Sequence, residues 1–214
     1  VTCKKTAKTF SQLLTFEQRA DIGDGWYHGV AVNDQVFTTA ASSADVAIIA
    51  DGPFKSTLRI AVTMHVPEAF DFKSMTRSSK TAPLRIISEV TLRQGSETIE
   101  VTTSVENNVL DHRLRVLFPT GLSGDSYFSD SAFDVVRRKI ALAGDNAIRK
   151  ELDVETKPQG SWSAFTDGKN GLAIIARGIP EIALCDTPDR PLALTLLRAF
   201  RRAVLSNDNM GGEI

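Results

Sequence analysis

The amino-acid sequence predicts an all-β protein, an antiparallel β-sandwich with little helix. Three observations lead to this expectation. Apolar and polar residues alternate over several long segments, turn signals of Gly, Pro and Asp divide the chain at short intervals, and few segments have helical spacing. Short strands separated by frequent turns are typical of sandwiches. The 214 residues suffice for a large core, and we expect one domain over residues 1–214.

The clearest strands have a period of two. Residues 58–66 alternate apolar and polar side chains, which is typical of a half-buried strand. The same alternation over residues 84–93 and 99–106, with turn residues at 94–97 between them, predicts a long β-hairpin. A further strand over residues 111–118 follows directly. We therefore expect three consecutive strands in an antiparallel meander.

Other segments give weaker signals. The apolar runs at residues 44–50 and 171–177, bounded by Gly, Asp and Pro, predict strands buried on both faces. Residues 132–138 allow one or two helical turns. Residues 191–205 fit a helix and a strand equally well, because their apolar side chains satisfy both periods. Residues 73–81 are rich in Ser, Thr and Lys and predict an exposed loop.

Composition excludes several classes of protein. The formal net charge of −1 gives no general attraction to nucleic acid or to an anionic membrane. No apolar run approaches the ~18 residues that a membrane-spanning helix needs. The two cysteines, Cys3 and Cys185, form no CxxC pair, which argues against a disulfide scaffold and is compatible with a reducing compartment. We expect a cytoplasmic location. The start at Val1 without a signal pattern, and the Gly-Gly turn near Ile214, lead us to expect a piece of a longer protein.

No motif for metal binding or nucleophilic catalysis is present in the sequence. His28, His65 and His112 lie far apart and show no HxH or HExxH spacing. Asp111 and His112 are neighbours, so on a strand they point to opposite faces and cannot hold one ion together. A GxSxG motif and a phosphate-binding glycine loop are also missing. We therefore predict neither a metal site nor a catalytic residue in this chain.

Two charged or aromatic segments are candidates for a binding surface. In an extended chain Asp111, Arg113 and Arg115 share one side, which predicts a polar face suited to another chain or a sugar. Residues 21–28 hold two aspartates, two glycines and three rings. One interpretation is a turn that presents its rings to a sugar. The other is a β-turn whose Trp26 fills the core while the aspartates cap backbone N–H groups.

Further polar and aromatic groups have simpler interpretations. Residues 159–167 carry Trp162 and Phe165, which we expect to pack at a sheet edge. The arginines near residues 137–138 and 198–202 are expected to form a solvated face or ion pairs.

Six segments, taken in order, resemble the C-terminal β-sandwich region of glycoside hydrolase family 38, the α-mannosidase family. Together they span nearly the whole chain, and each keeps its order in the family. They are residues 16–28 (FEQRADIGDGWYH), 51–60 (DGPFKSTLRI), 105–122 (VENNVLDHRLRVLFPTGL), 127–138 (YFSDSAFDVVRR), 158–181 (PQGSWSAFTDGKNGLAIIARGIPE) and 196–205 (LLRAFRRAVL).

The resemblance implies one part of a large retaining glycosidase. Family members carry an N-terminal α/β barrel, a helical bundle and then β-sandwich domains of the galactose mutarotase-like supersandwich type. The nucleophilic aspartate and the zinc ligands lie on the barrel, so the resemblance implies no cofactor in this chain and zinc in the N-terminal domain. A retaining mechanism needs two carboxyl groups about 5–5.5 Å apart. No such pair is predicted here, so this chain alone should be inactive.

The resemblance also implies substrate-binding residues and partners. A tyrosine from the sandwich is expected to reach the substrate, and residues 21–28 are the matching segment. In this sequence Trp26 occupies the position that is more often tyrosine, and Tyr27 follows, so both rings are candidates together with His28. Asp130 matches an aspartate beside the junction with the barrel. The implied partners are the protein's own catalytic barrel and an α-mannoside, without nucleic acid or membrane, and homo-oligomerisation stays open.

Two alternatives to this interpretation stay open. The chain could be an autonomous carbohydrate-binding module that uses Trp26 and Tyr27. It could instead be a structural or oligomerisation domain, with the face of Arg113 and Arg115 buried in an interface.

Overall fold

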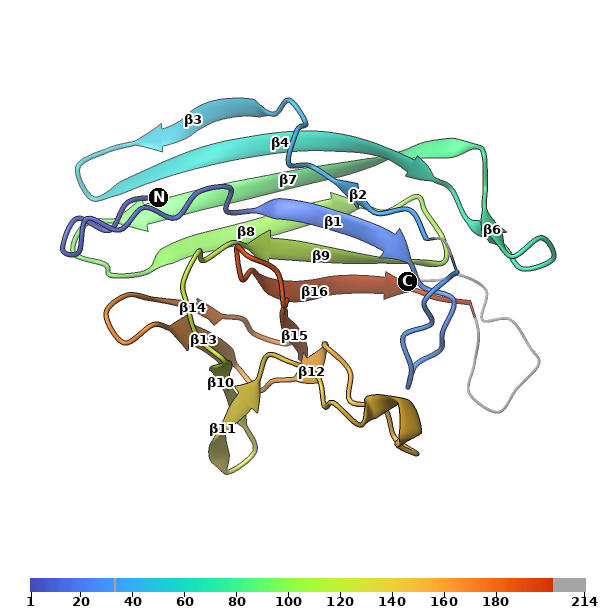
Figure 1. The fold of residues 1–214 in the computed structure, drawn as a ribbon. Coiled ribbons are helices and arrows are strands. Elements are labelled where there is room, and N and C mark those ends of the chain that lie inside the picture. The colour runs from blue at the N-terminus through green and yellow to red at the C-terminus, as the bar shows by residue number, and fades with distance from the viewer. Residues whose placement is uncertain (33, 202–214) are drawn as a thin grey trace. The chain divides into compact units, whose positions relative to one another are not determined.

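The computed structural model describes residues 1–32 and 34–201 (Figure 1). Within this part of the chain the secondary structure consists of β-strands and one 3-10 turn, Asn146–Ile148. All strand pairs whose register is defined are antiparallel. The predicted all-β, antiparallel class is therefore confirmed. No helix in the described ranges is long and apolar enough to cross a membrane.

The strands form four sheets. The first has six strands in the order β12-β15-β16-β9-β1-β2. These strands are β1 (Thr15–Ala20), β2 (Phe37–Thr38), β9 (His112–Phe118), β12 (Lys157–Pro158), β15 (Glu181–Leu184) and β16 (Leu192–Ala199).

The other three sheets are smaller. The second has the order β11-β10-β13-β14, and the third has the order β3-β4-β7-β8. The second is built from β10 (Ser126–Ser131), β11 (Asp134–Lys139), β13 (Trp162–Thr166) and β14 (Gly171–Ile175). The third is built from β3 (Asp45–Asp51), β4 (Lys55–Pro67), β7 (Thr81–Arg93) and β8 (Ile99–Glu106). A two-stranded ribbon pairs β5 (Phe70–Asp71) with β6 (Thr76–Arg77).

The chain folds into two compact units. The first contains Val1–Phe16 and Leu114–Leu197, and the second contains Glu17–Arg113 and the residues from Arg198 on. Strands β1, β9 and β16 contribute residues to both units. The expectation of one domain over residues 1–214 stays a prediction.

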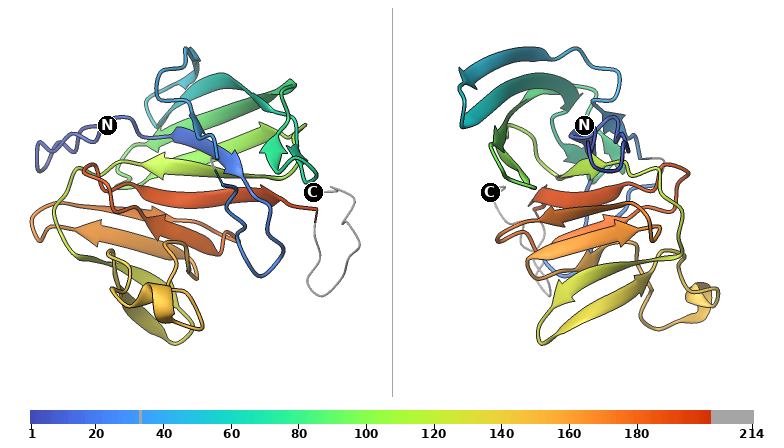
Figure 2. Two further views of the ribbon diagram at one scale, coloured as in Figure 1. Left: turned by 45° about the vertical axis from the view of Figure 1, so that its right-hand side comes forward. Right: turned by 90° about the vertical axis from the view of Figure 1, so that its left-hand side faces the viewer.

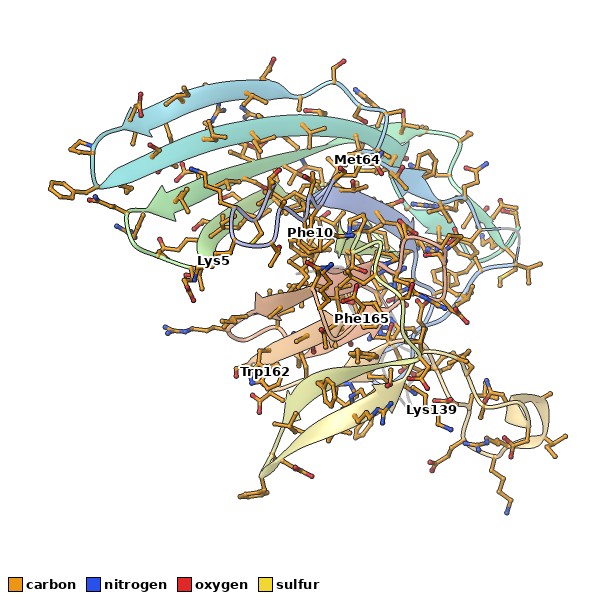
Figure 3. The ribbon with its side chains drawn as sticks, turned by 60° about the vertical axis from the view of Figure 1, so that its left-hand side comes forward. Lys5, Phe10, Met64, Lys139, Trp162 and Phe165 are labelled. Carbon is orange, nitrogen blue, oxygen red and sulfur yellow. The ribbon has the colours of Figure 1, made fainter. Side chains whose placement is uncertain are left out.

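The first unit contains the β11-β10-β13-β14 sheet. Phe165 on β13 is fully buried, whereas Trp162 on the same strand is half-buried (Figure 3). The predicted helical turns at residues 132–138 are wrong, because β11 pairs with β10 across a tight turn at Phe133. Phe133 has a φ of 70° and a fully exposed ring. A strand that alternates exposed and half-buried residues replaces the doubly buried strand predicted at residues 171–177.

Residues 191–205, for which helix and strand were equally favoured, form strand β16 as far as Ala199. Leu192, Leu194 and Ala199 are buried on this strand. Residues 202–205 of this segment lie outside the described residues.

The second unit contains the β3-β4-β7-β8 sheet, whose strong curvature is visible in Figure 2. Strands β4 and β7 pair without interruption from Lys55 opposite Arg93 to Pro67 opposite Thr81. The predicted hairpin is confirmed, because β7 and β8 pair up to Leu92 opposite Ile99. Val62, Met64 and Leu84 are among the buried core residues of this sheet, and Met64 is labelled on β4 in Figure 3.

Two predictions about this part of the chain are wrong. Strand β3 forms at the expected place, but nearly all its residues are exposed rather than buried on both faces. The meander also fails, because β9 belongs to the six-stranded sheet while β8 is an edge of the four-stranded sheet. The chain changes direction between them at Asp111, whose φ of 54° lies in the left-handed region. Alternation predicts a strand but does not choose its neighbour.

Candidate functional site

Residues 21–28 form a closed turn in the second unit, called the aromatic turn below. Two backbone bonds close it, from Asp24 N to Tyr27 O at 3.0 Å and from Ile22 N to Gly29 O at 3.0 Å. Gly23 and Gly29 approach each other so closely that a Cβ on either would overlap backbone atoms of the other. The turn therefore depends on glycine at both positions.

Both aspartates of the turn hold backbone N–H groups. Asp21 Oδ1 accepts hydrogen bonds from Gly23 N and Gly29 N, each at 3.2 Å. Asp24 Oδ1 accepts from Trp26 N at 2.8 Å and from Tyr27 N at 3.0 Å. The predicted capping role of the two carboxylates is confirmed, and it fixes the backbone that carries the rings.

Arg198, which lies near the end of β16, fastens the turn from a distant part of the sequence. Its Nε donates to Asp21 Oδ2 at 2.6 Å. Its Nη2 donates to the carbonyl oxygens of Asp24 at 2.9 Å and of Tyr27 at 3.1 Å. One guanidinium thus bonds to a buried carboxylate and two turn carbonyls, which is the planar fork geometry that arginine offers.

These contacts keep Asp21 ionised. Burial raises the pKa of the Asp21 carboxyl, but hydrogen bonds from His28 and Arg198 and the Arg198 charge outweigh burial. The net effect holds the pKa well below its usual range. The ionised Asp21 carboxylate accepts hydrogen bonds from Gly23, Gly29 and Arg198. We therefore assign it a structural role rather than one in proton transfer.

The rings of the turn point into solvent. The side chain of Trp26 is 87% exposed and that of Tyr27 is 54% exposed. The alternative in which Trp26 fills the core is therefore excluded. His28 is half-buried, and its Nδ1 lies 3.5 Å from Asp21 Oδ2 and 3.3 Å from Nη1 of Arg113. Since Arg113 only donates, Nδ1 accepts from Arg113 in the neutral ring or donates to Asp21 when protonated.

The segment around Asp111 also combines an aspartate with a histidine and is hydrogen-bonded to the turn, but its carboxylate is closed to solvent. Asp21 N donates to the Asp111 carbonyl at 2.9 Å. The Asp111 carboxylate receives two bonds of 2.6 Å from Arg201 and one of 2.8 Å from Phe70 N. Asp111 is 1% exposed. The carboxylate is thus satisfied inside the unit.

The predicted polar face of residues 111–115 is therefore wrong. Asp111 precedes β9 in a left-handed conformation, so it does not continue the alternation of the strand. Arg115 is buried and forms an ion pair of 3.1 Å with Glu155. That ion pair holds Arg115 inside the unit, and its burial leaves the guanidinium no surface for an interface with another molecule.

His112, the one ring among residues 111–115, is fully buried and neutral. Its Nε2 lies 3.0 Å from Asn107 Oδ1, which identifies Nε2 as the protonated nitrogen. Burial and the neighbouring positive charge of Arg77 lower the pKa of His112 to about 4, against a smaller opposite effect of Asp21. His112 is a core residue. His65, by contrast, lies exposed on β4, as predicted.

Asp130 belongs to the first unit and has a local structural role. Its Oδ2 accepts from Ser161 Oγ at 2.6 Å and from Ser161 N at 2.8 Å, which lowers the pKa of the carboxyl. Gly160 packs so tightly against this carboxylate that a Cβ would meet Oδ2 at 2.6 Å. Of the four predicted site residues, the turn brings together Trp26, Tyr27 and His28. Asp130 connects β10 to the segment before β13.

Sequence reasoning did not single out Arg198 and Arg201 as parts of the site. The expectation that these arginines form ion pairs is confirmed, but the sequence did not indicate which carboxylates they bind. Arg198 and Asp21 are 177 positions apart, and Arg201 and Asp111 are 90 positions apart. No local pattern connects residues at such separations. Within residues 1–32 and 34–201, no group of three or more His, Cys, Asp or Glu side chains is arranged to hold a metal ion.

The fold is that of an antiparallel β-sandwich domain, and it exposes aromatic rings on a turn that the Asp21–Arg198 ion pair holds in place. The family model for the glycosyl hydrolases family 38 C-terminal domain matches residues 2–203. The chain belongs to this family.

Solved structures of relatives share the fold. An α-mannosidase from Enterococcus faecalis superimposes with a TM-score of 0.85 at 30% identity, over 93% of this chain and 23% of that protein. A second glycosyl hydrolase family 38 protein from Enterococcus faecalis gives a TM-score of 0.82 at 29% identity, over 94% of this chain and 24% of its own. The predicted β-sandwich class is thereby confirmed.

A sequence relative extends the comparison. A Halalkalibacterium halodurans protein whose name proposes a mannosylglycerate hydrolase is 24% identical over an alignment of 217 residues, which covers 92% of this chain and 23% of that protein. The chain spans about a quarter of the length of these relatives.

Proposed function

We propose that the chain is the C-terminal β-sandwich domain of a zinc-dependent retaining α-mannosidase, in which the aromatic turn forms part of the rim of the mannoside site. Membership of the family and the mannosidase title of an Enterococcus faecalis relative support this proposal. The observation that carries it is the pair of exposed rings, Trp26 and Tyr27, on a backbone fixed by Asp21, Asp24 and Arg198.

The rings suit a sugar for a physical reason. Each pyranose face carries apolar C–H groups between hydroxyls, and an aromatic face packs against such a patch while polar neighbours bind the hydroxyls. Exposed rings on a flexible loop would lose conformational entropy on binding. Here the turn backbone is already fixed, so this cost falls mainly on the side chains.

The chemistry of bond cleavage is proposed to lie outside this chain. The residues of the aromatic turn do not fit zinc, because Asp21 and Asp24 accept hydrogen bonds from backbone N–H groups and Asp21 is also bound by Arg198. We place the zinc and the nucleophilic carboxylate in an N-terminal catalytic barrel, where zinc would bind the sugar hydroxyls. In this proposal the residues of this chain position the sugar and take no part in bond cleavage.

The substrate is proposed to be an α-mannoside. The names of the relatives point to α-mannosides and to mannosylglycerate, and both share a mannose ring that the turn can contact. We further propose a cytoplasmic location, with which the free thiols of Cys3 and Cys185 are compatible. Asp130 is retained as a candidate for the junction with the catalytic barrel.

Kinetics of the full-length enzyme test the proposal. Trp26→Ala and Tyr27→Ala are compared with wild type on mannobiose and on mannosylglycerate. Loss of a ring that contacts the sugar should raise KM about tenfold, since about 1.4 kcal/mol of binding corresponds to a factor of ten. Phe133→Ala, which removes a fully exposed ring outside the aromatic turn, is the control and should leave KM unchanged. Unchanged KM in both turn variants would refute a substrate contact.

The 87% exposure of Trp26 also favours a second candidate, an autonomous carbohydrate-binding module. Calorimetric titration of the 214-residue protein with mannose and mannobiose distinguishes the two. Binding that Trp26→Ala or Tyr27→Ala abolishes would support the module. Absence of binding, together with a KM effect in the full-length enzyme, would support the rim of a larger site.

A further inference from the structure

One face of the β3-β4-β7-β8 sheet carries a continuous apolar surface. Cross-strand pairing places Ile48, Leu58, Val90 and Val101 opposite one another, with one residue from each strand. Leu92 and Ile99 form the next pair on the same face. Aligned apolar side chains in every strand of a sheet are the usual composition of a core-facing side.

Burial of this face changes from one end of the sheet to the other. Along β4 the exposed fraction falls from 40% at Leu58 to 7% at Val62 and 0% at Val66. Along β7 it falls from 53% at Leu92 to 0% at Ile86. Apart from the hydrogen-bonded pair Ser88 and Thr103, the residues on this face of β4, β7 and β8 between the covered and the uncovered end are apolar. The sequence thus continues a core stripe beyond the point where the fold covers it.

The uncovered end is called the apolar end below. Its exposed residues come from all four strands. They are Val46, Ile48, Leu58, Leu92, Ile99 and Val101. The opposite face of the same strands carries charged partners such as Arg93 with Glu100 and Arg85 with Glu106. The asymmetry between the two faces shows that only one is adapted to water.

We propose that the apolar end is an intramolecular packing surface for a part of the full-length polypeptide that lies outside these 214 residues. The chain accounts for only 23% and 24% of the two solved relatives, so about three quarters of such a protein is available to cover it. The apolar end continues a core stripe, and beyond the Ser88–Thr103 pair polar residues enter this face only in its last row, where Ser56 lies opposite Leu92 and donates to Asp51. A stripe continuous with the core favours a segment of the same fold over a separate partner. This inference rests on the proposal that the chain is a domain of a longer enzyme.

A pair of adjacent substitutions tests the packing surface. Val101→Lys places a charge on the apolar end, and Thr102→Lys places it on the opposite face, across from Glu89. Both sites are exposed in the 214-residue protein, so both variants of that protein should keep the wild-type Tm within about 2 °C. In the full-length enzyme Val101→Lys should lower Tm by about 5 °C or more, because the charge would be buried, whereas Thr102→Lys should not.

Two results would overturn the proposal. One is a full-length enzyme whose Tm is insensitive to Val101→Lys. The other is a full-length enzyme that sedimentation shows to be a dimer dissociated by Val101→Lys, which would identify a second copy as the occupant. Failure of the mannosidase proposal is distinguishable from failure of this one. It would be seen as an unchanged KM in Trp26→Ala and Tyr27→Ala, whereas the packing surface is tested by the Tm of Val101→Lys.

Discussion

Two neighbouring segments of the second unit each hold an aspartate against an arginine from the end of β16, yet they present opposite surfaces. Arg198 binds Asp21, and the aromatic turn around that aspartate exposes Trp26 and Tyr27. Arg201 binds Asp111, and nothing of that carboxylate reaches solvent. An aspartate–arginine pair thus supports a turn with exposed rings in one place and is part of the buried interior in the other.

The difference lies in what else the arginine binds. Arg198 donates to two carbonyls of the turn itself, so its bonds shape a loop whose side chains stay free. Arg201 donates to the carbonyl of Phe70, so its bonds connect Asp111 to the β5 strand and close the site. A dense cluster of charge in sequence therefore does not identify a functional surface. Exposed aromatic rings next to a fully hydrogen-bonded charge cluster are a better indication of a binding surface.

The largest expected effect is the loss of Arg201. Arg201→Ala leaves the Asp111 carboxylate buried without its two charged bonds, which should cost about 4 kcal/mol of unfolding free energy. Urea denaturation of the 214-residue protein measures this loss. The control is Arg137→Ala, which breaks an exposed pair with Asp125 and should cost at most about 0.5 kcal/mol. Equal effects of the two variants would show that Asp111 is not held as described.

Loss of Arg198 should have a slightly smaller effect on stability and a distinct effect on the turn. Arg198→Ala removes one bond to Asp21 and two to turn carbonyls, but Asp21 keeps its bonds from Gly23 and Gly29. We expect a cost of about 3 kcal/mol in the same denaturation assay. In a Trp162→Phe background, which leaves Trp26 as the single tryptophan, the fluorescence anisotropy should fall as the turn loosens. In Arg201→Ala the Trp26 signal should change less, which separates the two arginines.

His112 should make stability depend on pH. Its pKa is lowered from 6.5 to about 4 in the fold, so the unfolded chain binds a proton between these values while the folded chain does not. Stability should be fully present above pH 6.5 and fall by about 3 kcal/mol on acidification to pH 4. Denaturation across this range should show a shallower slope for His112→Gln, whereas His65→Gln, at an exposed position on β4, should retain the wild-type slope.

Loss of the exposed Trp26 ring should have the smallest effect on stability. Trp26→Ala should change the unfolding free energy by no more than about 0.5 kcal/mol, because the ring is almost fully exposed. Substitution of Phe165, which is buried in the first unit, should cost about 4 kcal/mol in the same assay. A large loss with Trp26→Ala would mean that the ring supports the fold rather than faces a ligand.

Local patterns predicted much of the secondary structure. Alternation located β4, β7 and β8 together with their hairpin, because a half-buried strand must alternate whatever lies around it. The capping roles of Asp21 and Asp24 were also predictable, since short polar side chains bind N–H groups two or three residues away. The β11 strand was missed, because residues 132–138 have a spacing that fits both helix and strand and the turn at Phe133 has no glycine.

The all-β class, the main hairpin, the family and the turn at Trp26 and Tyr27 could be predicted from the amino-acid sequence. These features depend on neighbouring residues, whose spacing can be read directly along the chain. The structure was needed to learn that β9 leaves the hairpin's sheet, that Asp111 and Arg115 are buried, and that Trp26 is exposed. Burial and long-range ion pairs depend on which distant segments meet, as Arg198 meets Asp21, and no local pattern encodes that meeting.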